Sequence, residues 1–195
     1  KVKLGNKLFH EKRLSPDNTI SCASCHDLKK GGTDQLPVSI GINNQKGPIN
    51  SPTVFNSRYN IKQFWDGRAK DLIEQAAGPV TNPKEMGSNW AYIVKVLTSD
   101  PEYMVLFKQA YDGHVNQATV TDAIAAFEET LVTPSRFDAY LQGNKEAISA
   151  QEKRGYETFK QVGCAACHNG INVGGNMFMK MGLVQDYFKA RGSAI

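Results

Sequence analysis

The sequence predicts a mainly α-helical protein, and three observations lead to this prediction. A long central stretch carries apolar side chains at helical spacing, and no segment predicts a strand longer than that of a short hairpin. A Gly-x-x-x-Phe pattern lies on a helical segment twice, beginning at Gly5 and at Gly155, and each copy precedes a Cys-x-x-Cys-His motif. These repeats indicate two similar modules in tandem. We place their boundary near Gly143, which gives residues 1–142 and 143–195.

Each predicted element follows from a local pattern of residues. In the helix before each Cys motif, a small Gly faces an aromatic residue one turn later, which suits close packing against a second helix. Residues 31–60 are rich in Gly, Asn, Pro and Ser, and they predict an irregular segment of the kind that is often functional. The other helices are predicted from apolar stripes, which are more typical of a core than of cofactor binding: Trp90, Ile93, Val94 and Leu97; Tyr103, Phe107, Ala110 and Tyr111; Ile124, Phe127 and Leu131; and Tyr156, Phe159 and Val162.

Capping residues predict where three of these helices begin. Asp100 followed by Pro101 is a cap with a proline in the first turn. Thr121 is the predicted start of the next helix, and Ser149 with Glu152 forms a capping box before the last.

The two Cys motifs contain every cysteine of the chain and two of its four histidines: Cys22, Cys25 and His26 in the first, and Cys164, Cys167 and His168 in the second. Cys-x-x-Cys-His is the attachment signal of c-type haem. Two thiols at this spacing can form thioethers with the two vinyl groups of one porphyrin, and the next residue, His, is held under the iron as its proximal ligand. The sequence therefore predicts two covalently bound haem c groups, with His26 and His168 as iron ligands, in modules that resemble cytochrome c.

Other uses of paired cysteines fit less well. A zinc ribbon places its two Cys pairs about 15–20 residues apart, far closer than these pairs. A thioredoxin-type redox motif needs a βαβ pattern that we do not find. Disulfides need no His after each pair.

Composition favours an ordinary folded chain. Hydrophobic residues make up 41% and charged residues 22%, and the net charge of +4 is spread out, so it does not suggest nucleic-acid binding. No apolar run is long enough to predict a membrane span. The chain starts at Lys1 without a Met, which suggests upstream processing or truncation. Because covalent haem is normally installed outside the cytoplasm, we expect a periplasmic protein.

Beyond the Cys motifs, further segments make the sequence resemble the bacterial dihaem cytochrome c peroxidases. The matches cover nearly the whole chain, and the segment Phe-Trp-Asp-Gly-Arg between two haem motifs is specific to this superfamily. The matching segments include Leu4-Gly5-x-x-Leu8-Phe9, Ile20-Ser21-Cys22-x-x-Cys25-His26, Lys46-Gly47-Pro48-x-Asn50-Ser51-Pro52, Gln63-Phe64-Trp65-Asp66-Gly67-Arg68-Ala69, Gln75-Ala76-x-Gly78-Pro79, Glu85-Met86 and Gly163-Cys164-x-x-Cys167-His168.

The resemblance implies reduction of hydrogen peroxide to water, with electrons from a small cytochrome c or a cupredoxin. It implies that the first haem is the peroxidatic one and that the second receives the electrons. Trp65 matches a Trp that the family places between the two haems, although a large buried aromatic is equally compatible with the sequence alone. Family members are commonly homodimers.

The resemblance also implies roles in a distal pocket. Glu85 and Gln75 match the family's distal carboxylate and amide, and Phe64 matches an apolar wall residue of the same pocket. A carboxylate there can shuttle a proton between the two peroxide oxygens. Asn50 matches a residue near the family's bound calcium ion, whose other ligands would come from a segment that this sequence does not contain.

Two features depart from the family. Its members usually carry a His in the loop after the first motif, where it binds the peroxidatic iron in the resting state; here the loop reads Gly41-Ile42-Asn43-Asn44, and Ile42 cannot bind iron. The second module stops at Ile195, so we expect it to be incomplete. The methionines Met177, Met179 and Met181 follow the second motif too closely to match the family's distal Met.

Two rival functions stay open. One is a dihaem oxidase or maturation enzyme of the same superfamily, such as the methylamine dehydrogenase maturation enzymes, which act on another substrate or protein. The other is a non-catalytic dihaem electron carrier with both irons six-coordinate.

Overall fold

The computed structural model describes residues 1–180 and 182–192, so Met181 and Ile195 lie outside the described residues. Within the described ranges the chain is helical, and its only β-type pairings are two isolated bridges, Ile40 with Lys46 and Gln63 with Ala69. This confirms the predicted mainly α-helical fold. The α-helices are α1 (Val2–Phe9), α2 (Cys22–Cys25), α3 (Leu72–Thr81), α4 (Trp90–Thr98), α5 (Pro101–Tyr111), α6 (Gln117–Glu128), α7 (Arg136–Leu141), α8 (Ala150–Gln161) and α9 (Tyr187–Arg191).

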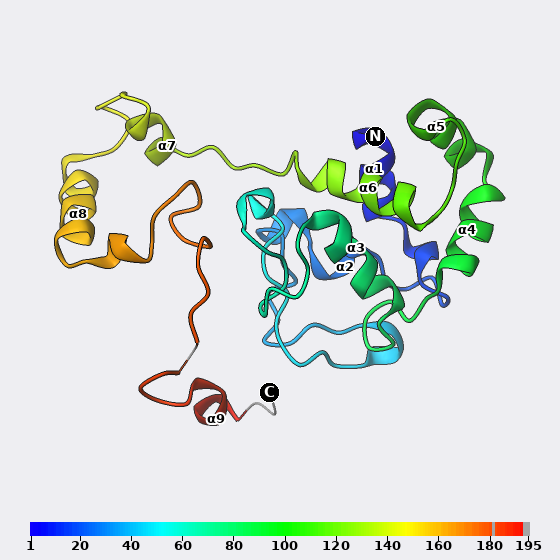
Figure 1. Ribbon diagram of the computed structural model, residues 1–195, viewed down its shortest axis with the longest axis horizontal. Helices are drawn as coiled ribbons and strands as arrows, with labels where there is room; N and C mark the ends of the chain where they lie inside the picture. The colour runs from blue at the N-terminus through cyan, green and yellow to red at the C-terminus, as the bar shows by residue number, and fades with distance from the viewer. Residues whose placement is uncertain (181, 193–195) are drawn as a thin grey trace.

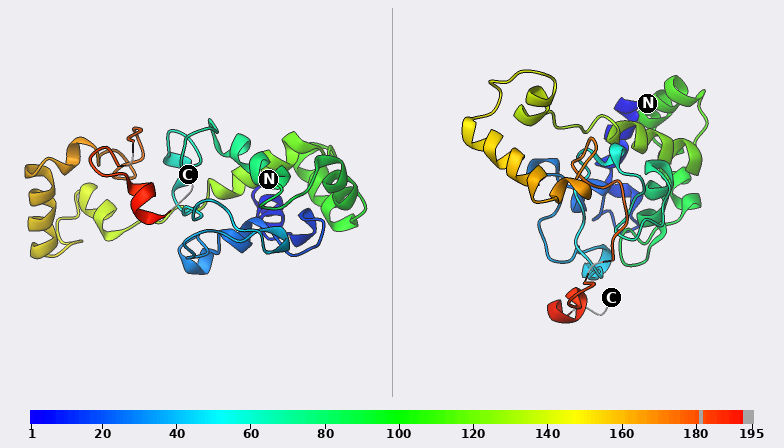
Figure 2. Two further views of the ribbon diagram at one scale, coloured as in Figure 1. Left: turned by 90° about the horizontal axis from the view of Figure 1, so that it is seen from below. Right: turned by 60° about the vertical axis from the view of Figure 1, so that its left-hand side comes forward.

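The hydrophobic core lies in the first two thirds of the chain. Figures 1 and 2 show α1, α3, α4, α5 and α6 gathered in one body, with α7 and α8 apart from it. The centre of this body is the crossing of α1 with α6, where the ring of Phe9 meets the edge of Phe127 with 5.3 Å between centroids. Burying such aromatic and aliphatic side chains is the main stabilising contribution to a fold of this size.

Gly5 is what allows α1 to lie so close to α6. A Cβ atom built at Gly5 would lie 1.8 Å from the carbonyl oxygen of Ala123 and 2.8 Å from Cβ of Phe127. The close packing predicted for the first Gly-x-x-x-Phe helix is therefore present. Around Gly155 in α8, by contrast, a Cβ atom would meet nothing within 4 Å.

Replacing Gly5 by Ala is expected to lower the free energy of unfolding by about 3 kcal/mol, because backbone must move to admit the methyl group. The matched control is Gly155→Ala, which fills open space on a helix and is expected to raise stability by up to about 1 kcal/mol through helix propensity. Urea unfolding followed by circular dichroism measures both. Equal effects of the two substitutions would contradict the packing role of Gly5.

The central helices agree with their predicted stripes, with one correction. Ile93 and Leu97 of α4, and Tyr103 and Phe107 of α5, are fully buried. The predicted helix start at Thr121 is wrong, because α6 begins at Gln117. The cap is Asn116, whose side chain accepts a hydrogen bond from the backbone of Thr119 while the Thr119 hydroxyl bonds back.

The C-terminal part is held together mainly by aromatic contacts. The ring of Phe137 in α7 meets that of Tyr156 in α8 with 5.0 Å between centroids, and Arg136 pairs with Glu152 at 2.7 Å. The Ser149–Glu152 capping box is present, but no residue of α8 is buried. Within the described chain, no helix covers α8 as α6 covers α1, so the tandem-module division stays a prediction.

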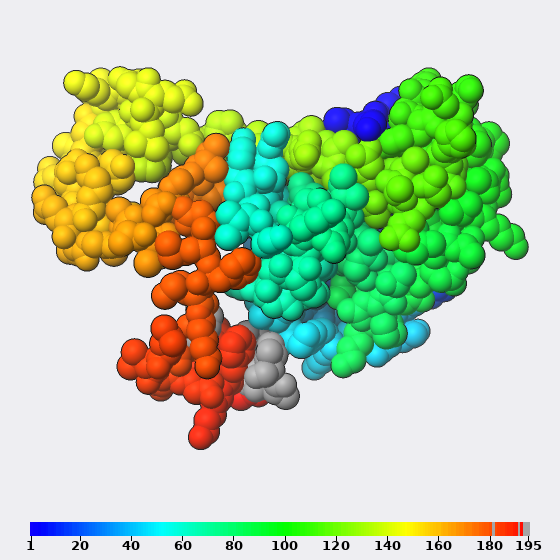
Figure 3. Space-filling model, viewed as in Figure 1, coloured from blue at the N-terminus to red at the C-terminus, as the bar shows by residue number. Residues whose placement is uncertain are grey.

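The C-terminal part also contacts the main body. The side-chain amide of Asn172 donates to the backbone carbonyl of Asn56 and to the side-chain oxygen of Asn60, each at 3.1 Å. Figure 3 shows this orange segment lying against the cyan one. None of the helices in residues 1–180 and 182–192 combines the length and hydrophobicity needed to cross a membrane.

Candidate haem sites

The first Cys motif forms its own short helix. Cys22 and Cys25 begin and end α2, and Ser21 caps it through a capping box with Ser24. Residues three apart in a helix lie on the same face, so the two thiols point to one side. Both cysteines are free thiols.

His26 ends this helix with its ring held in a definite orientation. Its Nδ1 lies 3.3 Å from the carbonyl oxygen of Gly32. A carbonyl can only accept, so Nδ1 carries the proton and Nε2 keeps its lone pair. Burial lowers the pKa of His26, which favours the neutral imidazole. A neutral His whose second nitrogen donates to a carbonyl is the usual arrangement of a metal-binding His.

The two thiols of the first motif have different surroundings. Burial, with a smaller contribution from the Glu128 carboxylate, raises the pKa of Cys22 to about 12. Burial and the carboxylates of Asp34 and Glu85 raise the pKa of Cys25 to about 11. Glu85 therefore lies close enough to Cys25 for their charges to interact.

The second Cys motif repeats the local arrangement on an exposed segment. It lies on a short 3₁₀ turn, Cys164–Ala166, and Cys164, Cys167 and His168 are exposed. The Nδ1 of His168 lies 3.2 Å from the carbonyl oxygen of Val173, so this nitrogen also donates and Nε2 is again left with its lone pair.

Both sets of residues fit a haem group. Each supplies two free thiols at the attachment spacing and one His whose Nδ1–H is already bonded to a backbone carbonyl. The fit rests on these donor sets alone.

Glu85 lies in the turn that follows α3. The side-chain amide of Asn82, the residue that ends α3, donates to Oε1 of Glu85 at 2.7 Å. Burial raises the pKa of Glu85, against the opposing effects of Asn82 and of the positive charge of Arg68. A carboxyl group with a raised pKa near a cofactor site is a candidate for proton transfer.

Phe64 packs against α3, the helix that carries Gln75. The Phe64 ring packs against Gly78 of α3, where a Cβ atom would come within 3.0 Å of it. Gln75 is half-buried and one helical turn before Gly78, so both face the same side of α3. Arg68 lies over the Phe64 ring at 3.5 Å from its centroid. Contacts and charge therefore link Phe64, Arg68 and Glu85.

Trp65 lies on the surface of the described chain. It is 57% exposed, and its indole Nε1 donates to the carbonyl oxygen of Asn50 at 3.1 Å. The alternative of a large buried aromatic is therefore wrong for the described chain.

Among the residues described, no three or more His, Cys, Asp or Glu side chains come together in a way that could hold a metal ion, near Asn50 or elsewhere.

Ile42 lies in the loop in which members of the resembled family usually carry a His. Its side chain is 6% exposed, and its backbone N–H donates to the carbonyl oxygen of Glu85 at 2.8 Å. The loop therefore lies directly against the turn that carries Glu85.

Three residues near the first site were not singled out from the sequence, although each left a signal. Arg68 was part of the Phe-Trp-Asp-Gly-Arg segment, and Asn82 stands three residues before Glu85, the spacing of a local side-chain contact. Glu128 falls on the apolar stripe of α6, four residues after Ile124; it is 4% exposed, its Oε2 has no hydrogen-bond partner, and burial raises its pKa to about 8.

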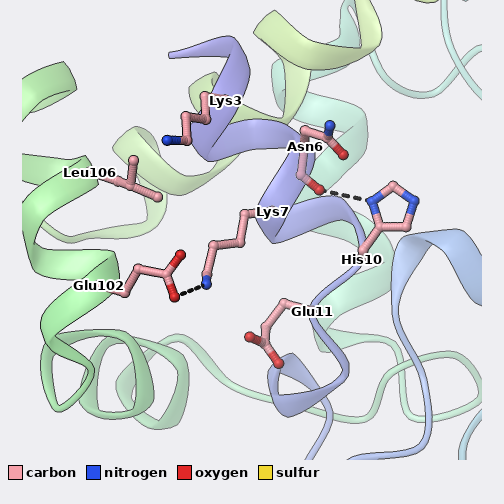
Figure 4. Close-up of a pocket in the computed structure, with 7 residues that line it drawn as sticks. All are labelled: Lys3, Asn6, Lys7, His10, Glu11, Glu102 and Leu106. Carbon is pink, nitrogen blue, oxygen red and sulfur yellow. Dashed lines mark hydrogen bonds and ion pairs between the residues drawn. The ribbon is translucent and has the colours of Figure 1, made fainter.

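A surface groove between α1 and α5 lies apart from these residues (Figure 4). Lys7 pairs there with Glu102 at 2.6 Å, and His10 shares a hydrogen bond of 2.9 Å with the carbonyl oxygen of Asn6. The groove holds no residue of either Cys motif.

Comparisons with known proteins agree with the two haem groups that the Cys and His residues indicate. The family model described as di-haem cytochrome c peroxidase matches residues 1–146. The chain is 53% identical over 188 residues to cytochrome c551 peroxidase of Nitrosomonas europaea, covering 95% of this chain and 56% of that protein. It is 50% identical over 189 residues to cytochrome c peroxidase Ccp of Escherichia coli, covering 96% and 41%.

Some of the more distant relatives carry a different name. The chain is 37% identical over 187 residues to the methylamine utilization protein MauG of Methylorubrum extorquens, covering 94% of this chain and 53% of that protein. A solved structure of a MauG-like protein associated with microbial copper homeostasis has a TM-score of 0.81 and 32% identity, covering 89% of this chain and 53% of that one. The chain spans about half the length of the curated relatives it matches. It belongs to the di-haem cytochrome c peroxidase family.

Proposed function

We propose that this protein is a cytochrome c peroxidase that reduces hydrogen peroxide to water with two covalently bound haem c groups. The observation that carries the proposal is the environment of the first Cys motif. Glu85, a carboxyl group with a raised pKa, lies near Cys25 and is held by Asn82. The second motif lies on an exposed segment, which suits exchange of electrons with a partner. The names of the relatives at 50–53% identity support the same activity.

The residues of the first motif would hold the peroxidatic haem. Cys22 and Cys25 would supply the thioethers, and His26 would supply Nε2 to the iron, while the carbonyl of Gly32 fixes the ring through Nδ1. The haem, when bound, supplies the iron at which peroxide is held and the route by which electrons reach it.

The distal residues handle the protons. Peroxide takes up two electrons and two protons, its O–O bond breaks, and two waters form. Glu85 accepts the proton of one peroxide oxygen and delivers it to the other, which leaves as water. Gln75 orients the peroxide by hydrogen bonding, and Phe64 forms an apolar wall that excludes bulk water. The positive charge of Arg68 favours the ionised form of Glu85.

Cys164, Cys167 and His168 would hold the second haem, which would supply the entry point for electrons. Trp65 would then support electron transfer toward the first haem. In this proposal residues 1–142 form the peroxidatic module, and residues 143–195 belong to the electron-transfer module.

The proposed setting follows from the cofactor and the family. The electron donor is a small cytochrome c or a cupredoxin, the location is the periplasm, and the protein forms a homodimer. A calcium ion near Asn50 is supported by the family match only, because the described residues gather no cluster of acidic ligands there. No step of the mechanism uses it.

Two covalent haems are expected in the mature protein. The intact mass measured by mass spectrometry should exceed that of the polypeptide by two haem groups, because each motif offers two free thiols. Both haems should remain with the protein in acid acetone. An increase of one haem only, or haem extracted by the acid, would contradict the prediction.

Replacing Trp65 by Leu is expected to slow electron transfer between the haems more than it slows peroxide binding. The side chain is exposed, so its loss should leave the fold intact. Stopped-flow measurement of the re-oxidation of the second haem separates the two steps. If transfer between the haems does not slow, Trp65 has no part in electron transfer.

The maturation-enzyme alternative is favoured by the MauG-like relatives. Steady-state turnover of peroxide with a reduced small cytochrome separates the two functions. The electron-carrier alternative requires both irons to be six-coordinate, so cyanide binding to the oxidised protein would exclude it.

A further inference from the structure

Two loops far apart in the sequence meet through their backbones beside the distal carboxyl group. We call residues 41–45 the clamp loop and residues 82–87 the Glu85 turn. The backbone N–H of Ile42 donates to the carbonyl oxygen of Glu85 at 2.8 Å. The side-chain amide of Gln45 donates to the carbonyl oxygen of Pro83 at 3.0 Å. The clamp loop is closed by its own hydrogen bond of 2.9 Å from the N–H of Gly41 to the carbonyl of Gln45.

Gly41 permits this contact because it has no side chain. A Cβ atom there would lie 2.1 Å from the carbonyl oxygen of Lys84 and 2.6 Å from that of Glu85. These are backbone atoms, so a side chain at position 41 must push the two loops apart. The φ angle of Gly41 is −101°, which other residues adopt readily, so contact and not backbone strain makes Gly necessary.

Ile42 and Gly87 complete the fit. The Ile42 side chain is buried against Gly87, where a Cβ atom would come within 3.1 Å of Cγ2 of Ile42. Gly87 has a φ angle of +59°, which favours glycine. The aliphatic side chain that replaces the expected His therefore packs on the turn that carries Glu85.

Hydrogen bonds within the Glu85 turn connect its backbone to the Glu85 carboxyl group. Asn82 accepts the N–H groups of Glu85 and Gly87 at its carbonyl oxygen, at 3.0 and 2.9 Å. Its side-chain amide donates to Oε1 of Glu85 at 2.7 Å. The clamp loop thus holds the backbone of the turn, and Asn82 holds the carboxyl group.

We propose that the clamp loop is a positioning element for Glu85, with Gly41 of the clamp loop and Asn82 of the Glu85 turn as positioning residues. The inference rests on the proposed function in that it gives Glu85 a task at the first haem. It predicts that the Glu85 carboxyl is held in place in the oxidised protein, before any electron arrives.

The test compares four variants of the intact, haem-loaded protein: Gly41→Ala, Gln45→Ala, Asn82→Ala and, as control, Lys46→Ala. Lys46 is exposed and adjacent to the clamp loop, and none of the side-chain hydrogen bonds and ion pairs found among the described residues joins it to the Glu85 turn. The first readout is hydrogen exchange of the Glu85 turn followed by mass spectrometry, which needs no turnover. Exchange should rise about tenfold or more in Gly41→Ala and less in Gln45→Ala, and should be unchanged in Lys46→Ala.

The second readout is the rate at which cyanide binds to the oxidised protein, since hydrogen cyanide must lose its proton to a base near the iron. Gly41→Ala and Asn82→Ala should slow binding toward the rate of Glu85→Gln, by about 10²-fold. Neither should slow it further when combined with Glu85→Gln, because residues that act through one group are not additive.

The outcomes separate this proposal from the proposed function. Unchanged exchange in both Gly41→Ala and Gln45→Ala, or fully additive losses in the double variants, overturns the clamp while leaving the role of Glu85 intact. If Glu85→Gln itself reacts normally with peroxide, the role of Glu85 fails, and the exchange data still decide whether the clamp exists. If Gly41→Ala does not fold, Gln45→Ala and Asn82→Ala carry the same comparison.

Discussion

Replacing Glu85 by Gln is expected to lower the turnover of hydrogen peroxide by about 10²–10⁴-fold, the usual contribution of general acid–base catalysis. A neutral amide keeps the shape of the side chain and the hydrogen bond to Asn82, but it cannot take a proton from one peroxide oxygen and return it to the other. Steady-state turnover with a reduced small cytochrome measures the loss, in protein whose two haems have been verified.

The pH dependence of peroxide turnover should follow the ionisation of Glu85. Glu85 must be ionised to accept the proton, so the rate should fall as the pH decreases through its pKa. Because burial raises that pKa, the acid limb should lie at higher pH than for an exposed Glu. Glu129→Gln, which changes an exposed carboxyl at the end of α6, is the matched control and should leave both rate and limb unchanged. Normal turnover in Glu85→Gln would remove Glu85 from the mechanism.

The first haem is expected to be high-spin in the fully oxidised protein, with peroxide access before any reduction. Ile42 has no lone pair to offer the iron, and its backbone is bonded to Glu85. His10 shares a hydrogen bond with the carbonyl oxygen of Asn6 and lines a groove that holds no residue of the first Cys motif. We therefore expect that the iron would stay five-coordinate or bind only water.

Electron paramagnetic resonance of the oxidised, full-length protein measures the spin state directly. Ile42→His offers the family's resting-state ligand, and it is expected to convert part or all of the first haem to the low-spin form and to delay the reaction with peroxide until the second haem is reduced. Two purely low-spin haems in the unaltered protein would show that another residue binds the iron, and the open site would be excluded.

Much of the fold could be predicted because local signals agreed with long-range packing. The stripes of α4 and α5 carry the buried side chains, and Gly5 has the close contact that its small size suggested. The start of α6 was missed because Thr121 and Asn116 are both cap-forming residues, and only the bond to Thr119 decides between them. Exposure of the apolar stripe on α8 could not be foreseen, since helical spacing says nothing about which partner covers a face.

The candidate site was predictable to a smaller extent. The Cys motifs specify their chemistry by spacing alone, and the donation from His26 to Gly32 follows from local geometry. The clamp loop left no pattern, because its contacts end on backbone carbonyl oxygens about forty residues away. A mismatch with the family at Ile42 indicated a missing ligand but not the contact with Glu85 that the structure contains.

The measurement that tests the central proposal most directly is a titration of the intact, haem-loaded protein with hydrogen peroxide in the presence of a reduced small cytochrome. Each peroxide needs two electrons, so two molecules of cytochrome should be oxidised for each peroxide consumed, and Glu85→Gln should lose this reaction. Cytochrome oxidation that does not exceed that of the same mixture without the protein would contradict a peroxidase.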